Sequence, residues 1–218
     1  MRRWLVAVFL MVPGLALGQS APGGAAPQPT SAQKFAAVMQ NAGHRQAVLS
    51  DAELTPAWVA LGCKTASFAE APEVAVYAPV KFDVSGAPLA GEWREGVVAT
   101  GCGQRMQLNV LTEVTGPSTL ASGALLPGAT ITDPVLQNAA QAYAVRAAGG
   151  LPAGCKDAFV ANTAFLGFLD GQKGMPQGPI TTPWREDWVL YFCGGLKVVR
   201  LQFSPGVAGI SVAVMGVR

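Results

Sequence analysis

Residues 184–203 have the sequence WREDWVLYFCGGLKVVRLQF, and its alternation predicts a β-hairpin. From Trp184 to Phe192 every second position is apolar or is Glu186, so these side chains share one face of a strand. The Cys193-Gly194-Gly195 stretch predicts a tight turn, because glycine readily adopts a positive φ angle. On the return strand, the residues that fall opposite the apolar face are Val199, Leu201 and Phe203. The residues of the other face are polar: Arg185, Asp187, Arg200 and Gln202.

The same pattern occurs once earlier in the chain. Trp93-Arg94-Glu95 recurs as Trp184-Arg185-Glu186, and Cys102-Gly103 recurs as Cys193-Gly194, so 184 − 93 and 193 − 102 both equal 91. The preceding cysteines, Cys63 and Cys155, differ by 155 − 63 = 92. Ordered matches at nearly one spacing predict two tandem copies of one unit, residues 31–126 and residues 127–218. The second tryptophan of the pattern, Trp188, has Val97 as its counterpart in the first unit.

The four cysteines predict two disulfide bonds. If each unit closes on itself, the bonds are Cys63–Cys102 and Cys155–Cys193, with similar spacings of 102 − 63 = 39 and 193 − 155 = 38 residues. Crossed pairings would make the two units unequal. A metal site is the alternative, but the chain has no C-x-x-C pair and only one histidine, so we expect neither a metal nor a cofactor.

The N-terminus has the features of a signal peptide in residues 1–18. Arg2 and Arg3 precede an apolar stretch, and Ala16-Leu17-Gly18 matches the small-x-small pattern of a cleavage site. A flexible leader rich in Pro, Ala and Gly is expected in residues 19–30. Cleavage removes two of 15 Lys and Arg, which leaves 13 against 13 Asp and Glu. We therefore expect an exported protein, periplasmic or extracellular, with no nucleic-acid partner and no membrane insertion after cleavage.

Further elements are expected around the two hairpins. Alternating residues predict strands over 74–82 and 210–214, and residues 158–169 are the counterpart of the first of these. One helix is expected after Ser31, ending at Gly43, and another after Thr132 or Asp133. A short helical turn is expected over 55–61. The predicted fold class is α+β: two tandem pseudo-repeats of antiparallel β-meander, with helices packed on one face and one disulfide in each.

The segment from Trp184 to Gly194 resembles a pattern in uncharacterised bacterial exported proteins, in which a Trp-x-Glu-x-Trp strand runs into Cys-Gly and an alternating strand follows. The resemblance covers about thirty residues of each unit. It implies export and no known activity.

Few side chains are candidates for chemistry. Glu95 and Glu186 lie by strand parity on the apolar faces, where a carboxylate can act as an acid or contact a ligand, or can sit near the strand start and reach water or backbone amides. The only histidine, His44, is expected to be solvated near a helix end. The candidate binding residues are Trp93, Arg94, Trp184 and Arg185.

These observations favour a non-catalytic module that binds a protein or a small ligand between or beside its two units. One alternative is a secreted hydrolase that uses Glu95 and Glu186 as paired carboxylates. The other alternative is a structural or assembly protein of the cell envelope.

Overall fold

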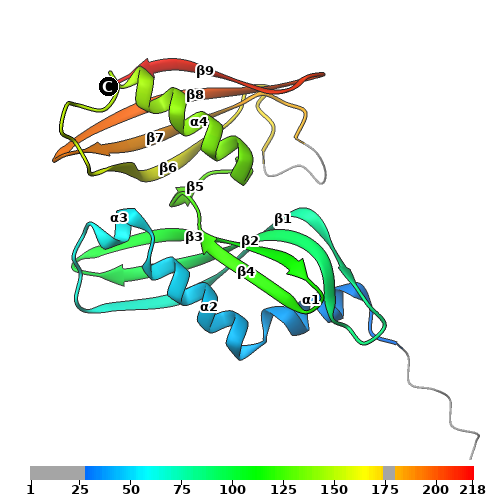
Figure 1. The fold of residues 1–218 in the computed structure, drawn as a ribbon. Helices are drawn as coiled ribbons and strands as arrows, with labels where there is room; N and C mark the ends of the chain where they lie inside the picture. The colour runs from blue at the N-terminus through cyan, green and yellow to red at the C-terminus, as the bar shows by residue number, and fades with distance from the viewer. Residues whose placement is uncertain (1–27, 174–179) are drawn as a thin grey trace, which may run out of the picture.

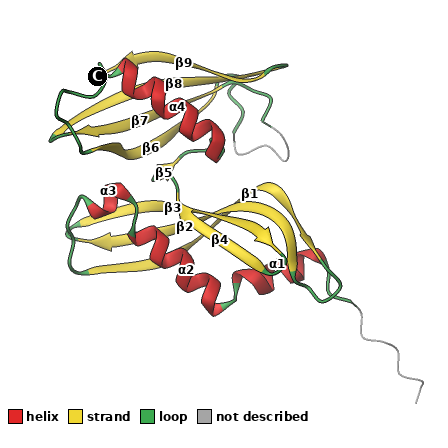
Figure 2. Ribbon diagram, viewed as in Figure 1, coloured by secondary structure: helices red, strands yellow, loops and turns green. Residues whose placement is uncertain are grey.

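The computed structural model describes residues 28–173 and 180–218, so the predicted signal peptide lies outside the described residues. The described chain is a mixed α+β protein with two mostly antiparallel sheets (Figures 1 and 2). Its elements, in order, are α1 (Ser31–Met39), α2 (Ala42–Glu53), α3 (Pro56–Val59), β1 (Ala66–Phe82), β2 (Pro88–Gly101), β3 (Gln104–Gly116), β4 (Thr119–Ala124), β5 (Gly128–Ala129), α4 (Pro134–Ala147), β6 (Ala158–Phe168), β7 (Trp184–Phe192), β8 (Gly195–Gly206) and β9 (Gly209–Val217).

The first sheet is the antiparallel meander β1-β2-β3-β4. Its core forms where α2 packs on one face of the sheet: Val48 and Ala52 of the helix meet Val97 and Leu108 of the central strands. All four residues are at most 1% exposed. Burial of these apolar side chains stabilises α2 on the sheet. The helix depends on this contact, because it has few apolar residues other than those that face the sheet.

The second sheet has the order β5-β6-β7-β8-β9. Among the described strands of this sheet, the two-residue strand β5 alone is parallel to its neighbour, and the other pairs are antiparallel. Helix α4 covers one face with small residues, Ala140 and Ala144, which allow it to approach the large side chains of Trp184, Trp188 and Phe203. The indole of Trp184 stacks on Phe203 with ring centroids 5.0 Å apart.

Each sheet contains one disulfide, and each involves the turn of a hairpin. The bonds are Cys63–Cys102 and Cys155–Cys193, the same pairs that the sequence analysis expected. Phe192 pairs with Gly195 across a two-residue turn in which Cys193 has φ 42° and Gly194 has φ 95°. Positive φ at both central residues is the geometry that matches the twist of a hairpin. The disulfide therefore anchors the hairpin tip to the chain that precedes the next outer strand.

The helices of the first unit differ from the prediction in two ways. Helix α1 is capped by Thr30, not by Ser31: the Thr30 side chain accepts from the Gln33 amide, and the Gln33 side chain accepts from the Thr30 amide. A new helix, α2, then begins at Ala42 and is capped by Asn41, whose side chain accepts from the His44 amide. Helix α2 was not expected, because Gly43 follows an apolar helical pattern and so resembles the end of the preceding helix.

Within the described ranges, no helix has the length and apolar character needed to cross a membrane.

Candidate functional site

The two Trp-Arg-Glu motifs lie on central strands of the two sheets. Strand β2 pairs with β1 and β3, and strand β7 pairs with β6 and β8. Because side chains alternate along a strand, the tryptophan and the glutamate of each motif face the helix-covered core, while the arginine faces the opposite side. The carboxylates of Glu95 and Glu186 are therefore inside the protein, 6% and 0% exposed.

Three donors converge on one oxygen of Glu95. Its Oε1 accepts from His44 Nε2 at 2.7 Å, from Trp93 Nε1 at 2.8 Å and from Thr112 Oγ1 at 3.1 Å. These donors come from helix α2, from β2 itself and from the neighbouring strand β3. Hydrogen bonds compensate the carboxylate for the loss of water, which a buried charged group otherwise cannot tolerate.

Glu186 is surrounded more completely, by five donors. Its Oε1 accepts from the Ile131 amide at 3.0 Å, Thr132 Oγ1 at 2.9 Å and Trp184 Nε1 at 3.1 Å. Its Oε2 accepts from Thr130 Oγ1 and Trp188 Nε1, both at 2.8 Å. A carboxylate has about four lone-pair sites. Glu186 has no acceptor capacity left for a substrate.

The positions of these residues correct two expectations. His44 is not a solvated residue at a helix end: it lies in the first turn of α2, its side chain is 3% exposed, and it binds Glu95. The two glutamates are buried and do not reach water from a strand start; among the described residues, Glu186 accepts from the backbone amide of Ile131, whereas the donors to Glu95 are side chains. The alternation of side chains along the strands correctly predicted that both glutamates lie on the apolar face.

A comparison of the two motifs explains the role of His44. In the second unit, Trp188 supplies one donor to Glu186, but Val97 occupies the equivalent position in the first unit. The imidazole of His44 supplies the missing donor to Glu95 from a different element. The signal in the sequence was this substitution: a buried carboxylate that lacks its second indole needs a donor from elsewhere, and histidine is one of the few side chains that can provide it.

Arg94 connects the first sheet to the second unit. On the face away from Glu95, its guanidinium donates to the backbone oxygen of Thr130 and to Glu73. Thr130 in turn donates its hydroxyl to Glu186. The candidate residue Arg94 is therefore buried, at 3% exposure, and its contacts link the buried glutamate of the second unit to the first sheet.

The segment between β4 and α4 lies against this same face of the first sheet. The side-chain amide of Asn109 donates to the backbone oxygens of Leu126 and Gly128, at 2.7 and 2.9 Å. Gly128 has φ 94°, and a Cβ atom there would lie 2.2 Å from the backbone oxygen of Thr163. Nearby, burial raises the pKa of Tyr77 above its ordinary value, while the positive charge of Arg94 opposes this effect. The junction between the units is thus closely packed and polar.

Arg185 does not repeat the role of Arg94. It is half-buried, and its Nε donates to Gln202 on the adjacent strand, 3.2 Å away. On the same face, Asp187 accepts from Arg200 at 2.7 and 2.9 Å and from Arg218 at 2.8 Å. The hydrogen bond from Arg200 is the main cause that lowers the pKa of Asp187 below its ordinary value.

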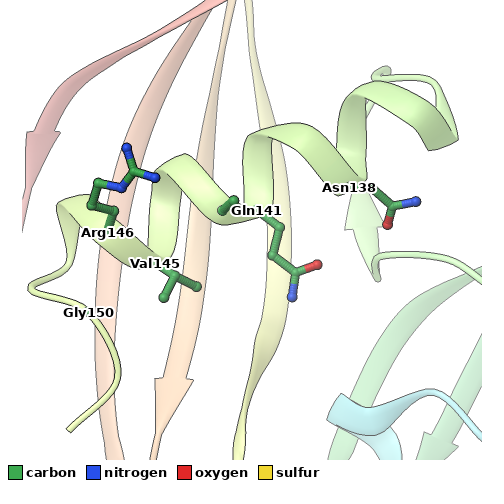
Figure 3. Close-up of a pocket in the computed structure, with 6 residues that line it drawn as sticks. Asn138, Gln141, Val145, Arg146 and Gly150 are labelled. Carbon is green, nitrogen blue, oxygen red and sulfur yellow. The ribbon is translucent and has the colours of Figure 1, made fainter.

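Neither glutamate lines the following surface hollows, although the third reaches His44, which binds Glu95. A hollow of about 580 Å³ lies along α4 and is lined by Asn138, Gln141, Val145 and Arg146 (Figure 3). A second, of about 380 Å³, lies beside α3 and is lined in part by Trp58, Val59 and Lys64. A third, of about 480 Å³, is lined in part by Lys34, His44 and Ser118. Within the described residues, no group of three or more His, Cys, Asp or Glu side chains could hold a metal ion.

Comparisons with protein-family models, curated proteins and solved structures found no match to the chain. The structure by itself defines a disulfide-bonded α+β protein with two buried glutamates, each held in the core of one sheet. The disulfides are consistent with an oxidising, non-cytoplasmic environment.

Proposed function

We propose that the chain is an exported, non-catalytic binding module, built from two copies of one ancestral unit and active in the periplasm or outside the cell. The observation that carries the proposal is the state of Glu186. Its carboxylate is completely buried and accepts from five protein donors, so it is an internal anchor and has no access to a substrate. A paired-carboxylate hydrolase needs both groups at one open cleft, and this geometry argues against that alternative.

Export is supported by the signal-like residues 1–18 and by the two disulfides. If residues 1–18 are removed during export and both bonds form, the intact mass of the exported protein should correspond to residues 19–218 less four hydrogen atoms. Recovery of the full-length chain with four free thiols would contradict this part of the proposal.

The surface beside the junction of the units is the place where we expect a protein partner to bind. Three large apolar side chains around α3 are exposed: Leu54 by 68%, Val59 by 57% and Leu61 by 41%. They fall within eight residues of one another, and Val59 also lines the hollow beside α3. Exposed apolar side chains that gather in one place are typical of a protein-binding surface, whereas isolated ones are ordinary. We call Leu54, Val59 and Leu61 the α3 surface.

Site-specific photo-crosslinking in the exporting cell tests this proposal. A photoreactive residue replaces Val59 on the α3 surface, and the matched control replaces Val84, which is 89% exposed in the loop between β1 and β2. We expect Val59 to yield an adduct of one defined mass with another exported protein, and Val84 to yield none. If Val59 gives no adduct, or if both positions give the same mixture, the binding role of the α3 surface is refuted. Hydrolytic turnover that is lost in Glu95→Gln would refute the non-catalytic assignment.

A further inference from the structure

Strand β9 forms an open edge of the second sheet. It pairs on one side with β8, and it ends the strand order of that sheet. Figure 1 shows β9, in red, at the rim of the molecule, with no described strand beyond it. In an antiparallel strand, alternate residues direct their N–H and C=O groups to opposite sides, so half of the backbone groups of β9 face outward. Such an edge can pair with a strand of another molecule.

The other long edge of the protein is protected against such pairing. Strand β1 carries Glu70, Glu73 and Lys81, and its pairing with β2 is interrupted by several register shifts. At the opposite edge of the first sheet, β4 has only six residues, and its Ser122 donates to Asp51 of α2. Charges, irregular pairing and short length are the usual means by which proteins block their sheet edges.

Strand β9 carries no charged side chain, and its pairing with β8 has one irregularity, a register shift between Val214 and Gly216. Residues 206–217 contain no Asp, Glu, Lys, Arg or Pro, and the pairing with β8 is regular from Gly209 to Val214. Three apolar residues near its end are exposed: Val214 by 38%, Met215 by 48% and Val217 by 44%. An uncharged edge strand of nine residues with a single irregularity near its end is unusual in a protein that protects its other edge.

We infer that β9 pairs with β9 of a second copy of the chain, antiparallel and about a two-fold axis, to form a continuous ten-stranded sheet. The composition of β9 favours a second copy over a charged peptide. The strand offers no charge that would select an oppositely charged partner, and in a self-pair no like charges oppose each other along residues 209–217. The inference rests on the proposed role as a binding module and assigns a partner to one of its surfaces.

Helix α4 lies over the same edge of the sheet. It packs against β8 and β9 as well as β7, and in a two-fold pair both α4 helices would lie on the same face. Figure 3 shows Gln141 and Val145 extending from one flank of α4. Tyr143 is two positions from each, which is about 200° around a helix, so it lies on the opposite flank. Tyr143 is 50% exposed, so the helix that packs against β9 also carries an exposed aromatic side chain.

Sedimentation analysis of the exported protein tests the inference with one pair of matched variants. Ala213 is exposed at the middle of β9, and Ala69 is exposed on the protected edge strand β1. We expect the wild-type protein and Ala69→Lys to sediment as dimers. Ala213→Lys places two lysines near the two-fold axis, so it should raise the dimer dissociation constant by about tenfold or more.

A charge-swap experiment separates loss of pairing from loss of folding. Ala213→Lys and Ala213→Glu should each be monomeric alone, and an equimolar mixture should form heterodimers, because opposite charges then face each other across the axis. A monomeric wild-type protein would overturn the inference, and so would dimers that Ala213→Lys does not weaken. Neither result bears on the crosslink at Val59, which tests the binding module on the other unit.

Discussion

The substitution of glutamine for each buried glutamate should have unequal effects, and the inequality can be worked out from the hydrogen bonds. Glutamine has the shape of glutamate, but only one of its two terminal atoms accepts hydrogen bonds. All three donors to Glu95 meet Oε1, so in Glu95→Gln the amide oxygen can take this place and keep every bond. The donors to Glu186 are divided between its two oxygens, so Glu186→Gln cannot keep them all.

In Glu186→Gln, the best orientation of the new side-chain amide leaves one indole without a partner. With the amide oxygen in the place of Oε1, three donors are retained and the amide nitrogen faces Thr130 and Trp188. Thr130 can reverse its hydroxyl and donate to Thr132 Oγ1, 2.9 Å away, but an indole N–H can only donate. One unpaired buried donor costs about 1–3 kcal/mol, and the remaining bonds lose their charge-assisted strength. We expect a loss of about 2–4 kcal/mol for Glu186→Gln and about 1 kcal/mol for Glu95→Gln.

Urea unfolding with both disulfides intact measures this difference. For a slope of about 2 kcal/mol per molar urea, the midpoint of Glu186→Gln should fall by about 1–2 M, and that of Glu95→Gln by about 0.5 M. The two variants carry the same chemical change and serve as controls for each other. An equal or larger loss in Glu95→Gln would refute the assignment of the donors.

Three further predictions concern the same networks and the junction. His44→Ala should lower the free energy of unfolding by about 2–3 kcal/mol, whereas His44→Gln, which keeps a donor, should lose about half as much; urea midpoints compare them. The hydrogen bond from Arg200 lowers the pKa of Asp187, so its stabilising effect is complete above the ordinary pKa of about 4 and is lost as the pH falls through the lower folded value. The stability of Asp187→Asn should therefore depend less on pH below about 4, and a curve parallel to the wild type would contradict this. Gly128→Ala, at φ 94° and without space for a Cβ, should be destabilised by about 2 kcal/mol or more in thermal unfolding, whereas Gly123→Ala, with no atom within 4 Å, should be nearly neutral.

Strand parity predicted which side chains face the core, because it depends only on neighbouring residues. Trp184, Glu186 and Trp188 share the buried face, as their spacing indicates. The partners of Glu186 could not be predicted in the same way. Thr130 and Thr132 are 56 and 54 residues away, and only the packing of the segment before α4 against β7 brings them to the carboxylate.

The prediction that His44 is solvated near a helix end was wrong for a local reason. A glycine after an apolar helical pattern usually marks a helix end, and Gly43 fits that description. The stronger signal was Asn41, which caps a new helix and places His44 in its first turn, facing the sheet. The burial of Arg94 was not predicted, for a different reason. Strand alternation shows that the Arg94 side chain points away from the core of its own sheet, but it does not show that residues 126–130 cover that face.

The junction gives the two proposed surfaces a fixed relation to each other. Thr130 accepts from Arg94 of the first sheet and donates to Glu186 in the core of the second, so one residue links the two sheets. The α3 surface lies on the first unit and the open edge β9 lies on the second, so pairing through β9 does not cover the α3 surface. A dimer formed through β9 would then present two α3 surfaces on one rigid body. Such an arrangement binds a partner with repeated sites more tightly than a single copy can, because the second contact becomes intramolecular.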